Sequence, residues 1–298
     1  MDESRLEERL ALAWEVRTRH WPPTIVASRP VDTLPVSVTG EACALDCAHC
    51  GGHYLKGMKP LKGLRPGNAP SLLISGGCDR QGRVPVREML PELLPVIEGR
   101  RTNWHLGAVD EADLTALAGL LDVVSFDFVG DDATLREVYG LDATVEDLEL
   151  RMERLAEIAR VVPHVTIGLR GGALGHEMPA LERLQRHRFD ALVFLVLIPT
   201  PGTRYAEAQP PAPEAAAEIL VEARLRFPEV SIQLGCMRPK GAYSEALDPL
   251  AVRAGVNVIV NPARSAVALA EEMGLTWETG YECCVFPATG VAGSVVPG

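Results

Sequence analysis

The sequence has no basic run and no aromatic motif of the kind that binds RNA. Its 298 residues carry a formal net charge of −11 at pH 7. Such a chain repels phosphate groups on average, so neither nucleic acid nor an anionic membrane is expected as its main partner. Composition averages over the whole surface and does not exclude a local basic patch.

The sequence also has no segment that would direct it to a membrane. The first 20 residues are charged and amphipathic, without the basic start and apolar core of a signal peptide. The longest apolar run, residues 191–199, is shorter than a membrane span and suits a buried strand. We therefore expect a cytoplasmic protein. Its seven cysteines are then expected to bind metal, do chemistry or pack in the core, because structural disulfides are rare in that compartment.

No composition break or flexible linker divides the chain. Short apolar runs rich in β-branched residues alternate with segments of helical spacing, which is the pattern of parallel strands buried on both faces. Hydrophobic residues make up 47% of the chain, enough for one large core. The predicted strands are residues 33–40, 71–77, 103–108, 123–130, 165–172, 192–199, 230–237 and 256–263. The predicted helices between them are residues 86–99, 110–121, 144–162, 213–227 and 244–255.

About eight strands alternating with helices predict an α/β fold, a closed or nearly closed parallel (β/α) barrel of the (β/α)8 TIM type. An extra N-terminal helix is expected to pack outside the barrel. Residues 1–275 would form the barrel domain, and residues 276–298 an irregular C-terminal tail over the barrel mouth. In such barrels the site lies where the strands end, and the chemically unusual side chains of this sequence follow the predicted strands.

The sequence CALDCAHC follows the first predicted strand of the barrel. Cys43, Cys47 and Cys50 form a C-x-x-x-C-x-x-C frame, which places three thiols on one short loop. One interpretation is a zinc site completed by His49 or His53, although structural zinc usually has four committed ligands. The other is an iron–sulfur cluster with three corners covered by cysteine and the fourth iron open to a substrate or cosubstrate.

This frame, with His49 directly before its last cysteine, resembles the signature of the radical S-adenosylmethionine superfamily. The resemblance implies a [4Fe–4S] cluster held by Cys43, Cys47 and Cys50, with S-adenosylmethionine on the open iron and His49 beside the cofactor. Cleavage of the carbon–sulfur bond by the reduced cluster would give a 5′-deoxyadenosyl radical. The protein would supply orientation and exclude water.

The sequence SGGCD ends the second predicted strand. Two glycines after a strand can simply form a turn. In the superfamily this strand has a glycine-rich end that contacts the methionyl part of the cosubstrate, which implies that role for Ser75, Gly76 and Gly77. Asp79 would either accept a hydrogen bond from the ammonium group or cap the turn.

Two charged residues lie within or at the end of apolar predicted strands. Burying a carboxylate is costly without a partner, so Asp127 either forms a structural ion pair or accepts hydrogen bonds from the ribose hydroxyls of the cosubstrate. Arg170 likewise either forms an ion pair or holds the carboxylate of the cosubstrate.

Four cysteines remain outside the first loop, namely Cys78, Cys236, Cys283 and Cys284. They are either small hydrophobic core residues or, for the last three, ligands of a second cluster that the tail completes. Successive side chains of an extended chain diverge, so either one of the adjacent pair is a bystander or the local turn is unusual. Arg238 is expected to act as a catalytic residue that contacts a cluster sulfide or the substrate.

Further segments resemble the biotin-synthase-related group that includes the two-component lipoyl synthases. The resemblance implies insertion of sulfur into an octanoyl chain on a carrier lysine, with a second iron–sulfur cluster as sulfur donor. The implied partners are an octanoylated lipoyl carrier protein, a paralogous radical S-adenosylmethionine protein and an electron donor such as ferredoxin or flavodoxin. The segments are VSVTGEACALDCAHCGGHYLKGM, LLISGGCDRQGRVPV, FDFVGDDATLREVYGL, IPTPGTRY, LGCMRPKG and AGVNVIVNPA.

The chain departs from single-chain lipoyl synthases, which carry a separate N-terminal cysteine group. It has no cysteine before Cys43, so a donor cluster would use the later cysteines. Carrier domains are often acidic, as is this protein, and docking would need a basic patch such as Lys56, Lys59 and Lys62. Two alternatives stay open: a biotin-synthase-like enzyme acting on a small molecule, and a non-catalytic iron–sulfur or zinc scaffold or partner subunit.

Overall fold

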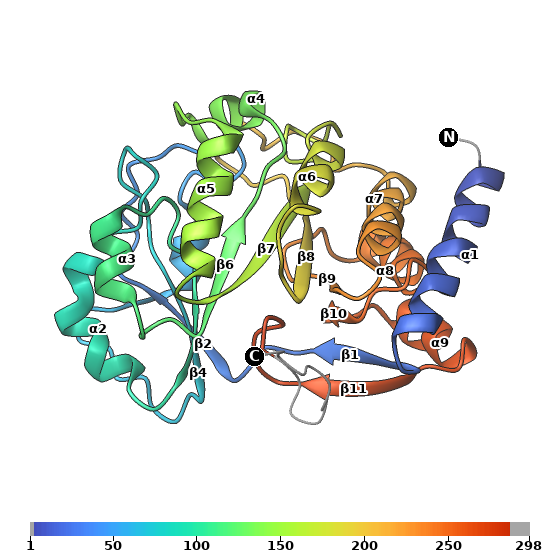
Figure 1. Ribbon diagram of the computed structural model, residues 1–298, viewed down its shortest axis with the longest axis horizontal. Helices are drawn as coiled ribbons and strands as arrows, with labels where there is room; N and C mark the ends of the chain where they lie inside the picture. Colours follow the sequence, from blue (N-terminus) through green and yellow to red (C-terminus); the bar gives the residue numbers. More distant parts are fainter. Residues whose placement is uncertain (1–2, 287–298) are drawn as a thin grey trace.

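The computed structural model describes residues 3–286, and these residues form an α/β fold built on one parallel sheet (Figure 1). Within them the sheet has eleven strands in the order β11-β1-β10-β9-β8-β7-β6-β5-β4-β2-β3. The strands are β1 (Thr24–Ser28), β2 (Thr33–Ser37), β3 (Lys59–Pro60), β4 (Ser71–Ser75), β5 (Arg101–Trp104), β6 (Val123–Asp127), β7 (Arg160–Ile167), β8 (Ala191–Val196), β9 (Ser231–Leu234), β10 (Val258–Val260) and β11 (Thr276–Gly280).

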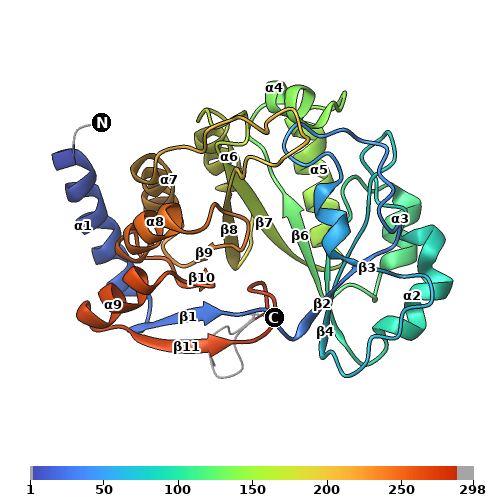
Figure 2. The same ribbon diagram turned by 180° about the vertical axis from the view of Figure 1, so that it is seen from behind.

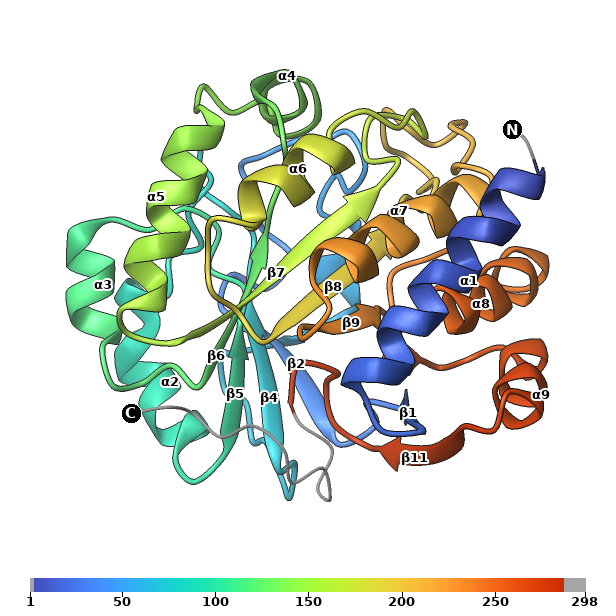
Figure 3. The same ribbon diagram turned by 45° about the vertical axis from the view of Figure 1, so that its right-hand side comes forward.

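Helices cover the outer face of the curled sheet, as Figures 2 and 3 show from two further directions. The N-terminal helix α1 (Glu3–His20) packs outside them against α7 and α8, as predicted. The other helices are α2 (Leu90–Ile97), α3 (Glu111–Leu117), α4 (Asp132–Thr134), α5 (Val145–Ala156), α6 (Glu177–Leu184), α7 (Pro213–Arg226), α8 (Ala242–Arg253) and α9 (Arg264–Glu272). Shorter helical turns are η1 (His53–Gly57), η2 (Arg87–Met89) and η3 (Leu135–Tyr139).

The curled sheet confirms the predicted parallel (β/α) barrel, in the form of a barrel that is open between its two edge strands. Strand β1 lies next to one end of the sheet and β2 next to the other, and residues 29–32 join them. The chain itself therefore crosses the opening. All eight predicted strands are present, and β1, β3 and β11 were missed. Strand β7 begins at Arg160, so the predicted helix over 144–162 ends early, at Ala156.

The predicted tail is wrong in two respects. Residues 276–280 are not irregular: they form β11, which pairs with β1 along its whole length and belongs to the barrel sheet. Residues 281–286 do not cover the mouth where the strands end. They contact the first residues of β2, β5 and β7, since Thr33, Arg101 and Arg160 all bond to them. Residues 287–298 lie outside the described part of the chain.

Side chains alternate between the two faces of the sheet. Trp104, Val124 and Phe126 belong to the large core between sheet and helices. The intervening residues of these strands therefore face the interior of the barrel, which we call the lumen. They include Asn103, Ser125 and Asp127. Within residues 3–286 no helix is both long and apolar enough to cross a membrane.

Candidate functional site

The three thiols of the first loop lie at the mouth where the strands end. Cys43, Cys47 and Cys50 follow β2 and all line one cavity of about 320 Å³. Backbone bonds fix the loop, because the Ala44 N–H donates to the Cys78 carbonyl at 2.7 Å and the Ala48 N–H donates to the Val138 carbonyl at 2.7 Å. The structure thus brings together the three residues that the sequence motif predicted as one ligand set.

The electrostatics of this loop suit a cationic centre. Burial, together with the neighbouring Cys50 and Cys43, raises the pKa of Cys47 to about 12. Burial also raises the pKa of Cys50. These thiolates are costly by themselves, and a bound metal centre would stabilise them.

The geometry also bears on the kind of metal centre. Among residues 3–286 no three His, Cys, Asp or Glu side chains are gathered tightly enough to hold a single metal ion. The zinc site completed by His49 or His53 is therefore not formed by these side chains. A cluster binds each cysteine at a separate iron, so its ligands lie further apart. Three cysteines on one loop are the ligand set that the motif predicts for an iron–sulfur cluster, and this ligation stays a prediction.

The glycine-rich end of β4 forms the floor beside this loop. Ser75, Gly76 and Gly77 line the cavity. A Cβ atom on Gly77 would lie 1.9 Å from the Ala42 carbonyl oxygen and 2.6 Å from the Cys43 Cα, so only glycine fits there. The sequence places two glycines here because the thiol loop packs directly against the backbone. The three residues are at the predicted place, and their contact with a cosubstrate stays a prediction.

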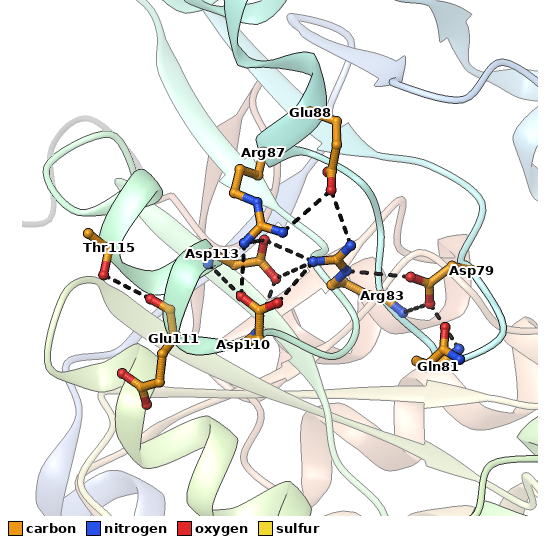
Figure 4. A network of polar contacts seen from close by, with 9 residues as sticks. All are labelled: Asp79, Gln81, Arg83, Arg87, Glu88, Asp110, Glu111, Asp113 and Thr115. Carbon is orange, nitrogen blue, oxygen red and sulfur yellow. Dashed lines mark hydrogen bonds and ion pairs between the residues drawn. The ribbon is translucent and has the colours of Figure 1, made fainter.

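Asp79 does not line the cavity. Of its two predicted roles, the structure shows the capping of the turn. Its carboxylate accepts from the backbone N–H groups of Gln81 and Arg83, and from Arg83 Nε at 3.4 Å. Figure 4 shows how the Arg83 guanidinium joins Asp79 to a network with Arg87, Glu88, Asp110 and Asp113. This network holds the loop that follows β4.

His49 lies in the cavity wall as a neutral ring. It contacts the ring of Tyr139 edge-on, with centroids 5.6 Å apart. Burial lowers the pKa of His49 to about 4. Its Nδ1 is buried without a hydrogen-bond partner among the described residues. An unsatisfied nitrogen in a cavity wall fits a polar group that binds there.

Asp127 ends β6 and also lines the cavity. It forms no ion pair with a described residue, so the structural-ion-pair alternative is wrong. Burial raises its pKa, and His164, its partner in register on β7, lowers it. The His164 ring lies 5.7 Å from that of His105, and burial lowers the pKa of each imidazole to about 4. The His164 Nδ1 bonds the Val162 carbonyl at 2.9 Å, which leaves Nε2 as an acceptor.

Arg170 is not at the cavity. Its guanidinium pairs with Glu137 at 2.6 Å on the surface, and Tyr205 donates to the same carboxylate. The cation that does line the cavity is Arg151 on α5. It forms no ion pair with a described residue. Sequence reasoning missed it, although its spacing from Thr144 and Leu148 places all three on one helix face.

Arg238 is a structural residue, and the expectation that it acts in catalysis is wrong. It is fully buried and forms a bidentate ion pair with Asp248, at 2.9 and 2.7 Å. Its remaining N–H groups bond the carbonyls of Gly235, Val260 and Asn261. All five donors of the guanidinium are therefore occupied, which leaves none for a cluster or a substrate.

Replacing Arg238 by leucine should lower the free energy of unfolding by about 3–5 kcal/mol, because Asp248 would stay buried without a partner. Arg238→Leu with Asp248→Leu should recover much of the loss. Arg170→Leu, which breaks an exposed pair, is the control and should cost less than about 1 kcal/mol. Urea unfolding measures all three. A fully stable Arg238→Leu protein that had lost cosubstrate cleavage would restore the catalytic assignment.

A second group of thiols lies deeper in the barrel. The Cys283 N–H donates to Thr33 Oγ1 at 2.8 Å, and Asn103 Nδ2 contacts the Cys283 sulfur at 3.4 Å. A hydrogen bond from Cys284 lowers the pKa of Cys283 to about 7. Burial raises the pKa of Cys236, which follows β9, and Cys283 raises it further. The three predicted ligands of a second cluster thus interact electrostatically, and their binding of a cluster stays a prediction.

The adjacent cysteines share this place because the chain turns there. The Phe286 N–H donates to the Cys283 carbonyl at 2.9 Å, which closes a turn over the pair. Cys283 and Cys284 pack against an apolar wall of the lumen formed by Val123, Val162, Ala191 and Val193, together with Val285 and Phe286 of the same segment. The unusual local turn, one of the two alternatives for the pair, is therefore the observed one.

Comparisons with known proteins give a sequence relative and structural neighbours. Biotin synthase from Ruthia magnifica subsp. Calyptogena magnifica is 26% identical over 188 residues, which are 59% of this chain and 56% of that protein. The match thus spans little more than half of this curated relative. No family model matches the chain.

Solved structures share the fold. The crystal structure of methylornithine synthase (PylB) superposes with a TM-score of 0.66 at 15% identity, over 93% of this chain and 90% of that one. Streptococcus suis SuiB, solved with S-adenosylmethionine bound, superposes with a TM-score of 0.51 at 13% identity, over 73% and 52%. At these identities the likeness concerns the fold alone.

Proposed function

We propose that the chain is a radical S-adenosylmethionine enzyme, as its similarity to biotin synthase supports. We further propose that it inserts sulfur into a protein-bound octanoyl chain as one component of a two-protein lipoyl synthase. In this proposal the substrate is an octanoylated lipoyl carrier protein. The second component is a paralogous protein of the same superfamily, and ferredoxin or flavodoxin supplies electrons.

The observation that carries the proposal is the placement of two thiol groups along one lumen. Cys43, Cys47 and Cys50 line the cavity that includes Asp127, at the end of β6. Cys283 and Cys284 pack with Val123, at the start of β6. Four residues of strand separate these levels, which is about 13 Å. A substrate chain between them would have a radical source on one side and a sulfur source on the other.

The cavity residues fit an iron–sulfur cluster with S-adenosylmethionine. When bound, this pair would supply a carbon-centred radical strong enough to attack an unactivated C–H bond. Arg151 offers the unpaired cation for the cosubstrate carboxylate, and Asp127 an acceptor for its ribose hydroxyls. Gly76 and Gly77 line the cavity beside the thiol loop, and His49 presents an unsatisfied nitrogen. These residues would bind and orient the cosubstrate.

The lumen offers separate surfaces to an alkyl chain and to polar groups. Val162 and Val193 are fully buried in the apolar wall and lie next to the second thiol group. An octanoyl chain against this wall would displace water from the path between the two sulfur sites. The second cluster would be held by Cys236, Cys283 and Cys284 and would donate the inserted sulfur.

A second candidate function is radical chemistry on a small polar molecule, as in a biotin-synthase-like enzyme. The observation that favours it is a polar part of the lumen wall, on β5, β6 and β7. Asn103, Ser125 and His164 are buried there, and the Ser125 hydroxyl donates to Asn103 Oδ1 at 2.8 Å. Such a wall can bind the polar groups of a small substrate.

The test is turnover of a short octanoyl-lysyl peptide by anaerobic, reduced protein with S-adenosylmethionine. We expect the peptide to raise 5′-deoxyadenosine formation by about tenfold or more, and a thiolated octanoyl group to appear by mass spectrometry. A butanoyl-lysyl peptide, which lacks carbons six and eight, is the control. Equal 5′-deoxyadenosine with both peptides and no thiolated product would reject the lipoyl assignment in favour of a free small substrate.

A further inference from the structure

The segment between the thiol loop and β4 carries exposed positive charges and no acidic residue. The chain has 40 acidic residues, yet none occurs between Asp46 and Asp79. Four exposed cations lie in this stretch. Within residues 3–286 none of the four forms an ion pair. We call them the basic rim, which consists of Lys56, Lys59, Lys62 and Arg65.

The basic rim borders the entrance to the cavity. Its first residue belongs to η1, which begins three residues after Cys50. Tyr54 and Leu55 of η1 line the cavity, while Lys56 of the same turn is exposed. Its second residue is in β3, the last strand of the sheet, whose outer edge is unpaired among the described strands. A molecule bound to the rim would therefore sit beside the opening that leads to the first thiol group.

We propose that the basic rim is the docking surface for an acidic carrier domain that delivers its acylated lysine into the cavity. The inference rests on the proposed function and names the surface through which that function selects its substrate. A protein of net charge −11 repels an acidic partner on average. An acid-free patch of unpaired cations reverses the sign of that interaction locally, so the partner is steered to the cavity entrance.

The geometry favours a carrier over other acidic partners, because the rim and the substrate entrance share one structural element. Lys56 and Tyr54 lie two residues apart on η1, one facing solvent and the other the cavity. A carrier lysine on a domain bound to the rim would therefore lie beside the cavity entrance. Because these cations are exposed, the attraction should weaken as ionic strength rises.

The experiment compares two charge-reversal variants of the holoenzyme. Lys56→Glu/Lys59→Glu changes the rim. Arg186→Glu/Arg188→Glu is the matched control, since these arginines are also exposed and unpaired among the described residues and follow α6 on the way to the start of β8. The substrates are an octanoylated carrier domain and the short octanoyl-lysyl peptide. The rim variant should raise KM for the domain about tenfold or more. The KM of the rim variant for the peptide should stay within about twofold of the value for the unchanged protein. The KM values of the control variant for the domain and for the peptide should do the same.

Calorimetric titration with the octanoylated carrier domain provides a readout without turnover, and should show the same selective loss of affinity. Equal affinity of the rim variant and the control for the domain would overturn the docking proposal, even if the peptide were converted. A rim variant that fails only when flavodoxin supplies electrons, and not dithionite, would assign the rim to the electron donor and also overturn it. Domain binding with no conversion of either substrate would instead reject the proposed function alone.

Discussion

Replacing Cys47 by alanine should remove the first cluster and with it the cleavage of S-adenosylmethionine. Cys47 lies in the middle of the thiol loop and lines the cavity with Cys43 and Cys50. Loss of one of three ligands leaves two thiolates at a site where burial already raises their pKa, so the remaining pair should not retain the metal. Formation of 5′-deoxyadenosine should fall by more than about a hundredfold, equivalent to about 2.7 kcal/mol of barrier.

Cys78 is the matched control for this variant because it is a fourth thiol in the same cavity wall. It is half-buried, and its sulfur packs close to Gly107 and to the main core. Cys78→Ala should therefore keep the iron, the sulfide and the visible absorbance of the cluster. Iron and sulfide analysis of both variants is the measurement. If Cys78→Ala lost as much iron as Cys47→Ala, the site would have four protein ligands and no open iron, and the proposed activity would fail.

The sequence predicted every inner strand except β1, because strands buried on both faces need continuous apolar runs. Strand β11 escaped for the opposite reason. It is an edge strand that pairs on one side alone, and its sequence TWETG is partly exposed along its whole length. No apolar run marks such a strand. Strand β11 sets the direction in which residues 281–286 leave the sheet. Because β11 was not predicted, the position of these residues was predicted wrongly as well.

The candidate site shows the same limit. Cys43, Cys47 and Cys50 were predictable because one short loop fixes their distance, whatever the rest of the fold does. Arg238 was predicted to act in catalysis but is structural, whereas Arg151 was not singled out but lines the cavity. Their roles depend on a helix distant in sequence, for Arg238, and on the rotation of a helix about its axis, for Arg151. The partner of Arg238, Asp248, is presented by α8, and the strand-end position alone suggested catalysis. A charged residue at a strand end is thus weak evidence for catalysis until the hydrogen-bond partners of its side chain are known.

Replacing Cys283 and Cys284 by serine should abolish sulfur insertion while sparing the first step. The pair lies at the far level of the lumen, next to Asn103 and Val123, and away from the thiol loop. Serine keeps the size of the side chain and its polar contacts, but it is a poor ligand for iron. Iron and sulfide should fall by about half, from two clusters to one. Thiolated peptide should fall by more than about a hundredfold, with 5′-deoxyadenosine formation within about twofold of the unchanged protein.

Two further variants make this result specific. Tyr281→Ser alters the same segment at a side chain that is 55% exposed, and it should change neither iron content nor product. Cys236→Ser should behave like the double variant, because Cys236 interacts electrostatically with both Cys283 and Cys284. Since Val285 and Phe286 anchor the segment in the lumen, circular dichroism and thermal unfolding should show each variant folded. Unchanged iron with unchanged thiolation in the serine variants would mean that these thiols are core residues, and that the inserted sulfur comes from another source.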